Sequence, residues 1–361
     1  MSSHTKIIPI FVPQDSCPYQ CIFCNQPAVV GKRKPLSSEE IEAYIHKCLQ
    51  SIKLSSPEGE SPHIEVAYYG GSFTLLPYQL QEGWLQPASE ALKRGLIRGI
   101  RLSTRPDWID NPTLSFLREK GVSVIELGVQ TMDDQLLTYI RRGHTSEDVV
   151  RAMELLRDFE FNAVIQLMIG LPGEDEATLN SSMEKVKSLK PNMLRLHPTL
   201  VIKETPLESL YLRGEYKPLS LKEAVTILKR LVLEFEAVGI RVIRLGLQPN
   251  QSLEEAGTII AGPYHPALGQ LVTSSIFYDL IKRGIERLEP EAMNRLDIEV
   301  FPENISNVMG NRRKNLARLK ESYPYCKIRI AGNSSLRDDQ MRLSISNKSI
   351  LLRKRELLRL R

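Results

Sequence analysis

The 361-residue sequence has no uninterrupted run of about 18 apolar residues, so we expect no membrane-spanning helix. Its first residues, Met-Ser-Ser-His-Thr-Lys, lack the charged and then apolar pattern of a secretory signal peptide. Cysteine is scarce as well, with five in the chain, three of which are clustered. This usage argues against a disulfide framework and for metal ligation in a reducing cytoplasm. We therefore expect a cytoplasmic protein of two domains, or of one large domain with an appendage.

The clustered cysteines are Cys17, Cys21 and Cys24, which follow an apolar extended run at residues 7–13. Two thiols would suit a redox pair, and four would close a structural zinc site. Three thiols leave one coordination position to a group outside the cluster, as catalytic metal sites require. A zinc site completed by a distant histidine, or cysteines without metal, are the alternatives. Cys48 and Cys326 are expected to be buried spectators.

Strand and helix patterns alternate along the first two thirds of the chain. Expected strands after the apolar run at residues 7–13 lie at 63–69, 98–105, 122–130, 162–169, 192–201 and 241–246. The intervening segments show helical patterns, for example at 112–120, 146–159, 174–189 and 219–239. Apolar strands that alternate with helices predict an α/β fold, a partial or near-closed parallel barrel of six to seven units. We assign residues 1–247 to this barrel.

Small and polar residues recur where the expected strands end. The second strand runs into Gly70, Gly71 and Ser72, and the fifth runs into Gly170. The fourth strand ends at Gln130. In parallel barrels the chemistry lies at the carboxyl ends of the strands, where the cysteines also fall. The sequence therefore predicts one site at this edge.

With Phe23 between its last two cysteines, the cysteine spacing resembles that of radical S-adenosylmethionine (SAM) enzymes. The resemblance implies that Cys17, Cys21 and Cys24 bind three irons of a [4Fe-4S] cluster, and that the fourth iron chelates SAM. It further implies that an electron from the cluster cleaves SAM to a 5'-deoxyadenosyl radical. The residues that it implies for SAM contacts are Gly70, Gly71, Ser72, Ser103, Gln130, Arg142, Gln166 and Gly170. An electron donor such as flavodoxin or ferredoxin is implied as a partner.

Several motifs are similar to those of the radical SAM half of the elongator catalytic subunit, a tRNA-modifying protein. They include Tyr69-Gly-Gly-Ser-Phe-Thr74, Ser103-Thr-Arg-Pro-Asp107 and Arg142-Gly-His-Thr145. That subunit uses acetyl-CoA through a downstream acetyltransferase domain. After Leu247 we find no Arg/Gln-x-x-Gly-x-Gly/Ala acetyl-CoA loop. The resemblance therefore implies an elongator-like radical SAM protein and gives no support to acetyl-CoA as a co-substrate.

The end of the chain is strongly basic. Residues 305–361 contain 15 Lys or Arg and four acidic residues, whereas the whole chain has a net charge of +5. Such a segment favours an anionic partner, RNA or tRNA first, although a solvated helix face would look the same. We expect residues 248–288 to be a connector that caps the barrel and residues 289–361 to be a small basic α+β domain. Its strand, helix, strand, strand, helix order, ending in a helix at 350–361, resembles a KH-type RNA-binding module with an incomplete Gly-x-x-Gly loop at Gly310.

We thus expect a radical SAM enzyme that modifies RNA. Two alternatives stay open at this point: a radical SAM enzyme that acts on a small metabolite or tetrapyrrole, and an iron–sulfur RNA-binding protein without catalysis.

Overall fold

The computed structural model describes residues 5–12, 17, 19–25, 36–55, 62–249, 251–290 and 293–360. By their internal contacts these residues form two compact units. The first comprises residues 1–218 and 248–262, and the second comprises residues 219–247 and 263–361. One unit boundary falls after residue 247, as in the division expected from the sequence, while the second unit also includes residues 219–247 and continues across residue 288. The difference arises because helix α9 (Leu221–Ala237) packs on helix α11 (Leu268–Leu288).

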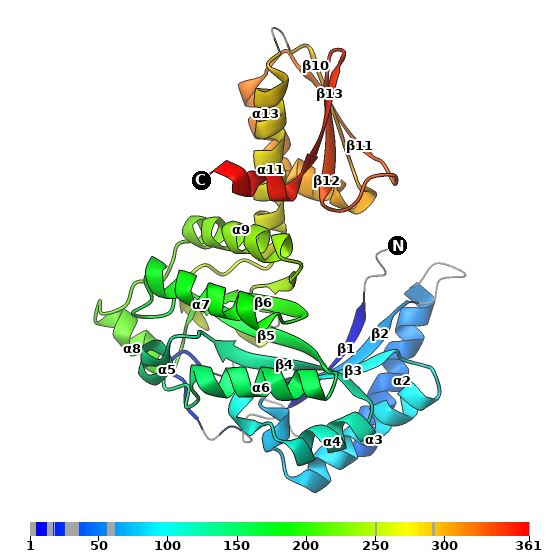
Figure 1. Ribbon diagram of the computed structural model, residues 1–361, viewed down its shortest axis with the longest axis vertical. Coiled ribbons are helices and arrows are strands. Elements are labelled where there is room, and N and C mark those ends of the chain that lie inside the picture. The colour runs from blue at the N-terminus through cyan, green and yellow to red at the C-terminus, as the bar shows by residue number, and fades with distance from the viewer. Residues whose placement is uncertain are drawn as a thin grey trace. The chain divides into compact units, whose positions relative to one another are not determined.

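The dominant feature of the fold is a seven-stranded sheet in the order β1-β2-β3-β4-β5-β6-β8. Its strands are β1 (Lys6–Val12), β2 (Ile64–Gly70), β3 (Gly99–Thr104), β4 (Val122–Gln130), β5 (Asn162–Ile169), β6 (Met193–Pro198) and β8 (Arg241–Leu245). The pairs from β1 to β6 are parallel, and the sheet curls into a half-barrel (Figure 1). The predicted parallel α/β barrel fold is therefore confirmed.

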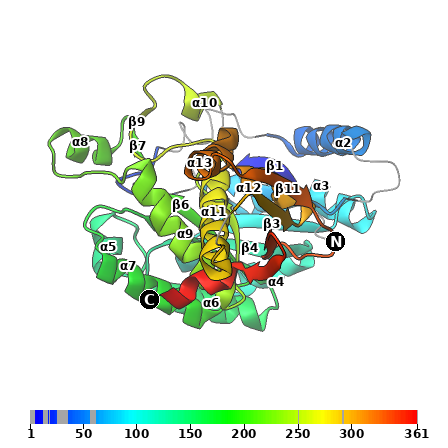
Figure 2. The ribbon, with the colours of Figure 1, turned by 90° about the horizontal axis from the view of Figure 1, so that it is seen from above.

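Helices cover the outer side of this curved sheet (Figures 1 and 2). They are α2 (Ser38–Ser55), α3 (Tyr78–Lys93), α4 (Asn111–Glu119), α6 (Ser146–Asp158) and α7 (Glu176–Leu189). Local sequence explains where they begin: Thr145 and Asp148 form a reciprocal capping box at the start of α6. The shorter elements of this unit are η2 (Phe73–Leu75), η3 (Pro106–Trp108), α5 (Asp134–Tyr139), β7 (Val201–Ile202), α8 (Pro206–Leu212), α10 (Gln251–Glu254) and β9 (Ile259–Ala261).

The second unit contains a four-stranded mixed sheet in the order β11-β10-β12-β13. Its strands are β10 (Arg295–Val300), β11 (Lys327–Gly332), β12 (Gln340–Ile345) and β13 (Lys348–Arg353). Strands β10 and β11 are parallel, and the other two pairs are antiparallel. The remaining elements after β10 are η4 (Pro302–Asn304), α12 (Ile305–Met309), η5 (Asn311–Arg313), α13 (Lys314–Ser322) and η6 (Lys354–Leu360).

One predicted element in this unit is wrong. We expected a basic amphipathic helix over residues 350–361, but residues 348–353 form strand β13 and only a 3₁₀ segment follows. Pairing with β12 across a tight turn at Ser346, whose φ is +53°, satisfies the backbone of this segment in the sheet. The module therefore lacks the final helix of the order that we compared with KH domains. None of the helices in the described part of the chain is long and apolar enough to cross a membrane.

Candidate metal centre at the carboxyl edge of the sheet

The predicted site residues are brought to one edge of the sheet. Because strands β1 to β5 are parallel, their carboxyl ends lie at the same edge. The cysteine loop follows β1, while Gly70 ends β2 and Gly71 and Ser72 follow it. Gln130 ends β4, and Gly170 follows β5. Ser103 and Gln166 lie on β3 and β5, and Arg142 lies after α5.

The three cysteines differ in exposure. Cys21 is buried, whereas Cys17 and Cys24 are half-buried, and all three are free thiols. A backbone hydrogen bond from the Cys24 amide to the Cys21 carbonyl (2.9 Å) closes a tight turn between the second and third cysteines. In the described part of the chain, no three His, Cys, Asp or Glu side chains lie close enough together to hold one metal ion. Residues 13–16, 18 and 26–35, which flank these cysteines, are outside the described residues.

Two residues, Ile22 and Asn25, anchor the cysteine loop to the rest of the first unit. The Ile22 amide donates to the Ile140 carbonyl (3.2 Å), and the Ile22 carbonyl accepts from the Leu207 amide (2.9 Å). The Asn25 side-chain amide donates to the Lys203 carbonyl (2.7 Å). Ile22 also belongs to an apolar cluster with Ile140, Met168, Leu171, Val201, Leu207 and Tyr216, against which Phe23, Leu210, Tyr211, Ile260 and Ala261 pack. The loop backbone is therefore held from several segments.

Arg142 links the cysteine loop to strand β4. Its Nη1 lies 3.8 Å from Cys21 Sγ, and its Nε and Nη2 donate to the Gly128 carbonyl at 3.1 and 2.5 Å. Burial lowers the pKa of the Arg142 guanidinium from its ordinary value, and the Cys21 thiol opposes that shift. Arg142 therefore places a cation beside one of the candidate metal ligands. The side chain also fills the space beside Gly128, where an added Cβ would lie 2.8 Å from Nη2.

The environment of the neighbouring His144 is equally cationic. Its imidazole is 4% exposed. Burial, followed by the charges of Arg142 and Arg105, lowers its pKa to about 3. The imidazole is therefore neutral at physiological pH. The two arginines beside this ring, Arg142 and Arg105, are also those that contact Cys21 and Tyr19 of the cysteine loop.

Glycine has a structural requirement at the end of β2. Gly70 adopts a φ of +107°, a conformation that L side chains rarely adopt. The amide of Gly71 donates to the Val12 carbonyl at the end of β1 (3.2 Å), so that this turn lies directly beside the strand that leads to the cysteines. Ser72 is 7% exposed and precedes the 3₁₀ turn η2.

Strand β4 is irregular where Gln130 ends it. The register shifts between Gly128 and Gln130, and Gln130 adopts a φ of +74°. A non-glycine residue in this conformation is strained, and such strain is frequent at functional sites. The Gln166 amide on β5 donates to the Gln130 side-chain oxygen at 3.4 Å. The two predicted glutamines therefore do come together, whereas Ser103 lies further along the edge, in register with Glu126.

The turn after β5 contains a half-buried carboxyl group, that of Glu174. The Gly170 amide donates to Glu174 Oε2 (2.6 Å), and the Gly170 carbonyl accepts from the Tyr216 hydroxyl (2.7 Å). Burial raises the pKa of Glu174 from 4.5 to about 7, against the opposing hydrogen bonds from the amides of Gly170 and Leu171. Gly170 is thus fixed on both sides by groups that the sequence did not single out.

An ion-pair network lies across the sheet below this edge. Arg101 on β3 pairs with Glu65 on β2 and with Glu126 on β4 (3.0 Å). Arg195 on β6 pairs with Glu126 (3.1 Å) and donates to the Tyr69 hydroxyl (2.9 Å). The two acids and two arginines balance in charge, as buried ionic groups generally must.

Two residues of the site were missed by sequence reasoning. Tyr19 lies between the first two cysteines, and its ring covers the guanidinium of Arg105, whose Cζ is 4.0 Å from the ring centroid. Arg105 follows β3 and is completely buried. A charged residue directly after an apolar strand was the available signal, although the contact partner 86 positions away could not be read from it.

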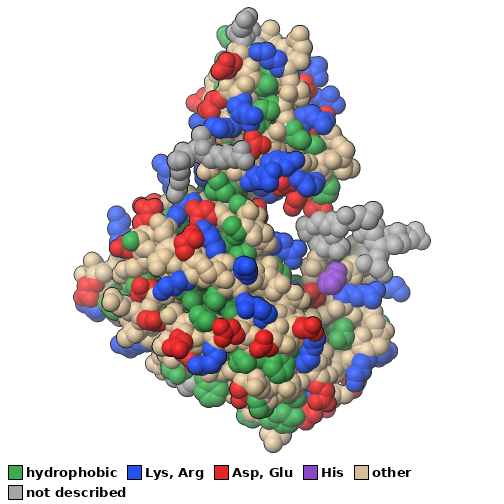
Figure 3. Space-filling view, in the orientation of Figure 1, with side chains coloured by type: hydrophobic (Ala, Val, Ile, Leu, Met, Phe, Trp, Pro, Cys, Tyr) green, Lys and Arg blue, Asp and Glu red, His purple; other side chains and the backbone are tan. Residues whose placement is uncertain are grey.

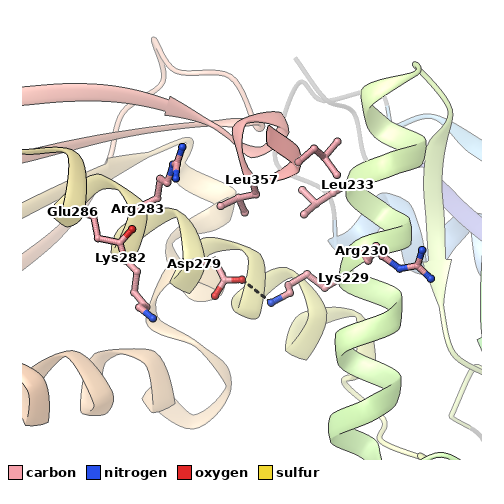
Figure 4. Close-up of a pocket in the computed structure, with 9 residues that line it drawn as sticks. Lys229, Arg230, Leu233, Asp279, Lys282, Arg283, Glu286 and Leu357 are labelled. Atoms are coloured by element: carbon pink, nitrogen blue, oxygen red, sulfur yellow. Dashed lines mark hydrogen bonds and ion pairs between the residues drawn. The ribbon is translucent and has the colours of Figure 1, made fainter. Parts of the chain in front are cut away.

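Of two pockets in the structure, one lies away from the predicted site residues and one lies beside the cysteine loop. One of about 280 Å³ belongs wholly to the second unit, where residues of α9, α11 and η6 line it and Lys229 pairs with Asp279 (2.6 Å; Figure 4). It contains no predicted site residue. The other, of about 580 Å³, belongs to the first unit and is lined by Ile22 of the cysteine loop together with residues of α5 and α8.

The fold and the three-cysteine loop define the class of protein. The Radical SAM superfamily model matches residues 11–186, and the Radical SAM C-terminal domain model matches residues 191–277. The chain therefore belongs to the radical SAM superfamily, whose cofactors are a [4Fe-4S] cluster and SAM.

Among curated relatives, the tRNA uridine(34) acetyltransferase of Methanocaldococcus jannaschii is 26% identical over 63% of this chain and 48% of its own length. Human Elongator complex protein 3 is 28% identical over 47% of this chain and 35% of its length. The structure of Elp3 from Methanocaldococcus infernus has a TM-score of 0.60 at 23% identity, over 76% of this chain and 63% of that chain. This chain thus spans about half the length of the tRNA uridine(34) acetyltransferase and about a third of the length of Elongator complex protein 3.

The donor set fits the cofactors of this family. Three thiols on one short loop are soft ligands of the kind that iron–sulfur clusters take, and Arg142 supplies a cation beside Cys21. The Cys24 amide donates to the Cys21 carbonyl, and the Cys17 thiol lies beside the Tyr19 carbonyl, so all three thiols belong to one hydrogen-bonded loop.

Proposed function

We propose that the chain is a radical SAM enzyme that acts on RNA, tRNA first. Cys17, Cys21 and Cys24 would hold the cluster. The residues that would contact SAM are Gly70, Gly71, Ser72, Ser103, Gln130, Arg142, Gln166 and Gly170. When bound and reduced by a donor such as flavodoxin or ferredoxin, the cluster supplies the electron that cleaves SAM to a 5'-deoxyadenosyl radical.

The observation that carries the catalytic part is the contact between Arg142 and Cys21 at 3.8 Å. It places a buried cation against the buried thiol of the loop. Because Arg142 is also tied to the carbonyl of Gly128, it sets the distance between the loop and strand β4. The strained Gln130 and its partner Gln166 lie on the same edge, where buried amides are costly unless a polar group pairs with them.

The RNA part is supported by the names of relatives and by the charge of the second unit. Relatives that match the radical SAM half are named tRNA uridine(34) acetyltransferase. Lys and Arg side chains are frequent on the face of the second unit that Figure 3 shows. Because this chain spans about half of those relatives, acetyl transfer is not included in the proposal.

Within the second unit, the turn between α12 and α13 is the best-defined basic feature. Arg312, Arg313 and Lys314 are consecutive and exposed. The two arginines adopt left-handed conformations, with φ of +50° and +60°. Asn315 fixes the turn, since its side-chain amide donates to the Ser274 carbonyl of α11 (2.8 Å). A rigid turn with three cations suits an RNA backbone.

The catalytic part is tested by anaerobic reconstitution with iron and sulfide, reduction with SAM, and assay for 5'-deoxyadenosine. We expect product from the wild-type chain and none from Cys21→Ala, whereas Cys48→Ala on α2 should retain the activity. A cluster-loaded wild-type protein without product, in the presence and absence of bulk tRNA, would contradict the proposal.

The RNA part is tested by electrophoretic mobility shift with bulk tRNA at low salt. A triple variant, Arg312→Ala, Arg313→Ala and Lys314→Ala, should lose at least about tenfold in affinity. A matched control removes the same charge from exposed positions of the first unit, Lys93→Ala, Arg94→Ala and Arg98→Ala, and should lose less. No binding of tRNA by the wild-type protein would favour the alternative, a radical SAM enzyme with a small-molecule substrate.

A further inference from the structure

The guanidinium of Arg105 is buried in an unusual arrangement. Arg105 is 0% exposed, and its Nε and Nη2 donate to the two carboxylate oxygens of Asp107 at 2.9 and 3.0 Å. Nη2 also donates to the backbone carbonyl of Arg142 at 2.6 Å. Nη1 is buried and has no hydrogen-bond partner among the described residues. Burying a cation costs free energy unless it is paired and hydrogen-bonded, and the Asp107 carboxylate supplies the pairing charge here.

The cysteine loop supplies the remaining contact of Arg105. The ring of Tyr19 lies over the guanidinium, with Cζ 4.0 Å from the ring centroid, which is the geometry of a cation–π interaction. Tyr19 is 37% exposed, so its position is not explained by burial alone. The Sγ of Cys17 lies 3.7 Å from the Tyr19 carbonyl, so the loop also folds on itself here.

The backbone of Gly143 is part of the same contact. Gly143 has a φ of +80°, and a Cβ added to it would lie 2.1 Å from the Tyr19 ring. The ring can therefore occupy this place only because residue 143 is glycine. The residue just before it, Arg142, is the one whose side chain meets Cys21.

We propose that Arg105 is a positioning residue for the metal-binding loop. It holds Tyr19 on one side and the Arg142 carbonyl on the other, and thereby keeps Cys21 beside Arg142. This inference rests on the proposed function in assigning the cysteines to the cluster, whereas the contacts of Arg105 lie between residues of this chain. Loss of either contact would release Tyr19 and expose the Cys21 thiol.

The test uses the metal-free, full-length protein and measures the rate of iodoacetamide alkylation of each cysteine by mass spectrometry. In Tyr19→Ala, Cys21 should react about tenfold faster than in the wild type, since the cation–π contact is lost. Arg105→Met should have the same effect, whereas Tyr19→Phe keeps the ring and should behave as the wild type. Cys326, buried in the second unit, is the internal reference.

Unchanged Cys21 reactivity in a folded Tyr19→Ala variant would overturn the proposal. Because Tyr19 is partly exposed, this variant is expected to fold even if Arg105→Met does not. A second readout is the electron paramagnetic resonance spectrum of the reconstituted, reduced cluster, which should change in Tyr19→Ala and return in Tyr19→Phe. Suppose that the alkylation rates change as expected but neither the wild type nor any variant cleaves SAM. The proposed function then fails, while the positioning role of Arg105 stands.

Discussion

At the residue scale, Glu126 is the acid on which the buried ion-pair network depends. It is 2% exposed and pairs with both Arg101 and Arg195. Glu126→Gln removes the charge that compensates them, and we expect the first unit to lose about 3 kcal/mol of stability. Urea unfolding followed by tryptophan fluorescence measures this loss, since both tryptophans, Trp84 and Trp108, lie in the first unit.

The matched control is Glu160→Gln. Glu160 pairs with Arg118 at 3.0 Å, but the two side chains are 81% and 46% exposed. An exposed pair of this kind contributes less than about 1 kcal/mol. Equal losses in the two variants would show that the network across the sheet is not desolvated as the structure indicates.

Glu174 should make the stability of the first unit depend on pH. Burial raises the pKa of its carboxyl group from 4.5 to about 7 in the folded state, so the folded protein holds a proton that the unfolded chain releases. The contribution of Glu174 to stability therefore falls as pH rises from about 4.5 to about 7, by as much as about 3 kcal/mol, and stays constant above that range. Glu174→Gln removes this loss.

Thermal unfolding at pH 5 and pH 8 measures the difference. The stability of Glu174→Gln minus that of the wild type should be larger at pH 8 than at pH 5. Glu184→Gln, at an exposed position of α7, should follow the wild type at both values. If the thermal midpoints of the wild type and of Glu174→Gln change by the same amount from pH 5 to pH 8, the raised pKa of Glu174 would be refuted.

The sequence predicted the residues whose chemistry is local and missed those that act through distant contacts. Three cysteines within eight positions and a glycine pair at a strand end can be recognised without a structure. Tyr19 and Arg105, in contrast, are unremarkable residues until folding stacks one on the other. The partner of Arg142 was likewise not readable, because Cys21 lies 121 positions earlier.

At the scale of elements, glycines in α3 and after α4 give opposite predictions. Gly83 lies within helix α3, and an added Cβ would meet nothing within 4 Å. Gly83→Ala should therefore stabilise the first unit by about 0.5–1 kcal/mol, because alanine loses less backbone entropy on folding. Gly121 has a φ of +83°, and its Cβ would lie 2.7 Å from Leu92, so Gly121→Ala should destabilise it. Thermal midpoints that move in the same direction would contradict this prediction.

Elements were predictable where the local pattern and the tertiary contacts agree. The capping box of Thr145 and Asp148 marks the start of α6 in the sequence and in the structure. The helix predicted over residues 350–361 was wrong because the alternation of apolar and basic residues there suits either a helix or a strand. Pairing of β13 with β12 decided in favour of a strand, and a neighbouring strand is not visible in a local pattern.

At the scale of the whole molecule, the uneven charge should make tRNA binding sensitive to salt. Residues 305–361 carry a surplus of basic residues while the chain as a whole is only at +5. Raising KCl from about 50 to about 200 mM should weaken tRNA binding at least about tenfold, because counterions released by the phosphates no longer favour association as strongly. Titrations at four salt concentrations give the slope.

The triple variant at residues 312–314 should reduce that slope by about 2–3, roughly one for each phosphate contact that is lost. The matched triple variant at residues 93, 94 and 98 should leave it nearly unchanged. Equal slopes for both variants would move the RNA-binding surface away from the turn before α13.

The division of the chain into units has a consequence for how such a protein can change over evolutionary time. The polypeptide passes from one unit to the other three times, at residues 218/219, 247/248 and 262/263. A single recombination point in the gene therefore cannot exchange or delete either unit as a whole. Unlike a domain attached at one end of a chain, the second unit consists of two separate stretches of sequence, so its exchange needs more than one recombination point.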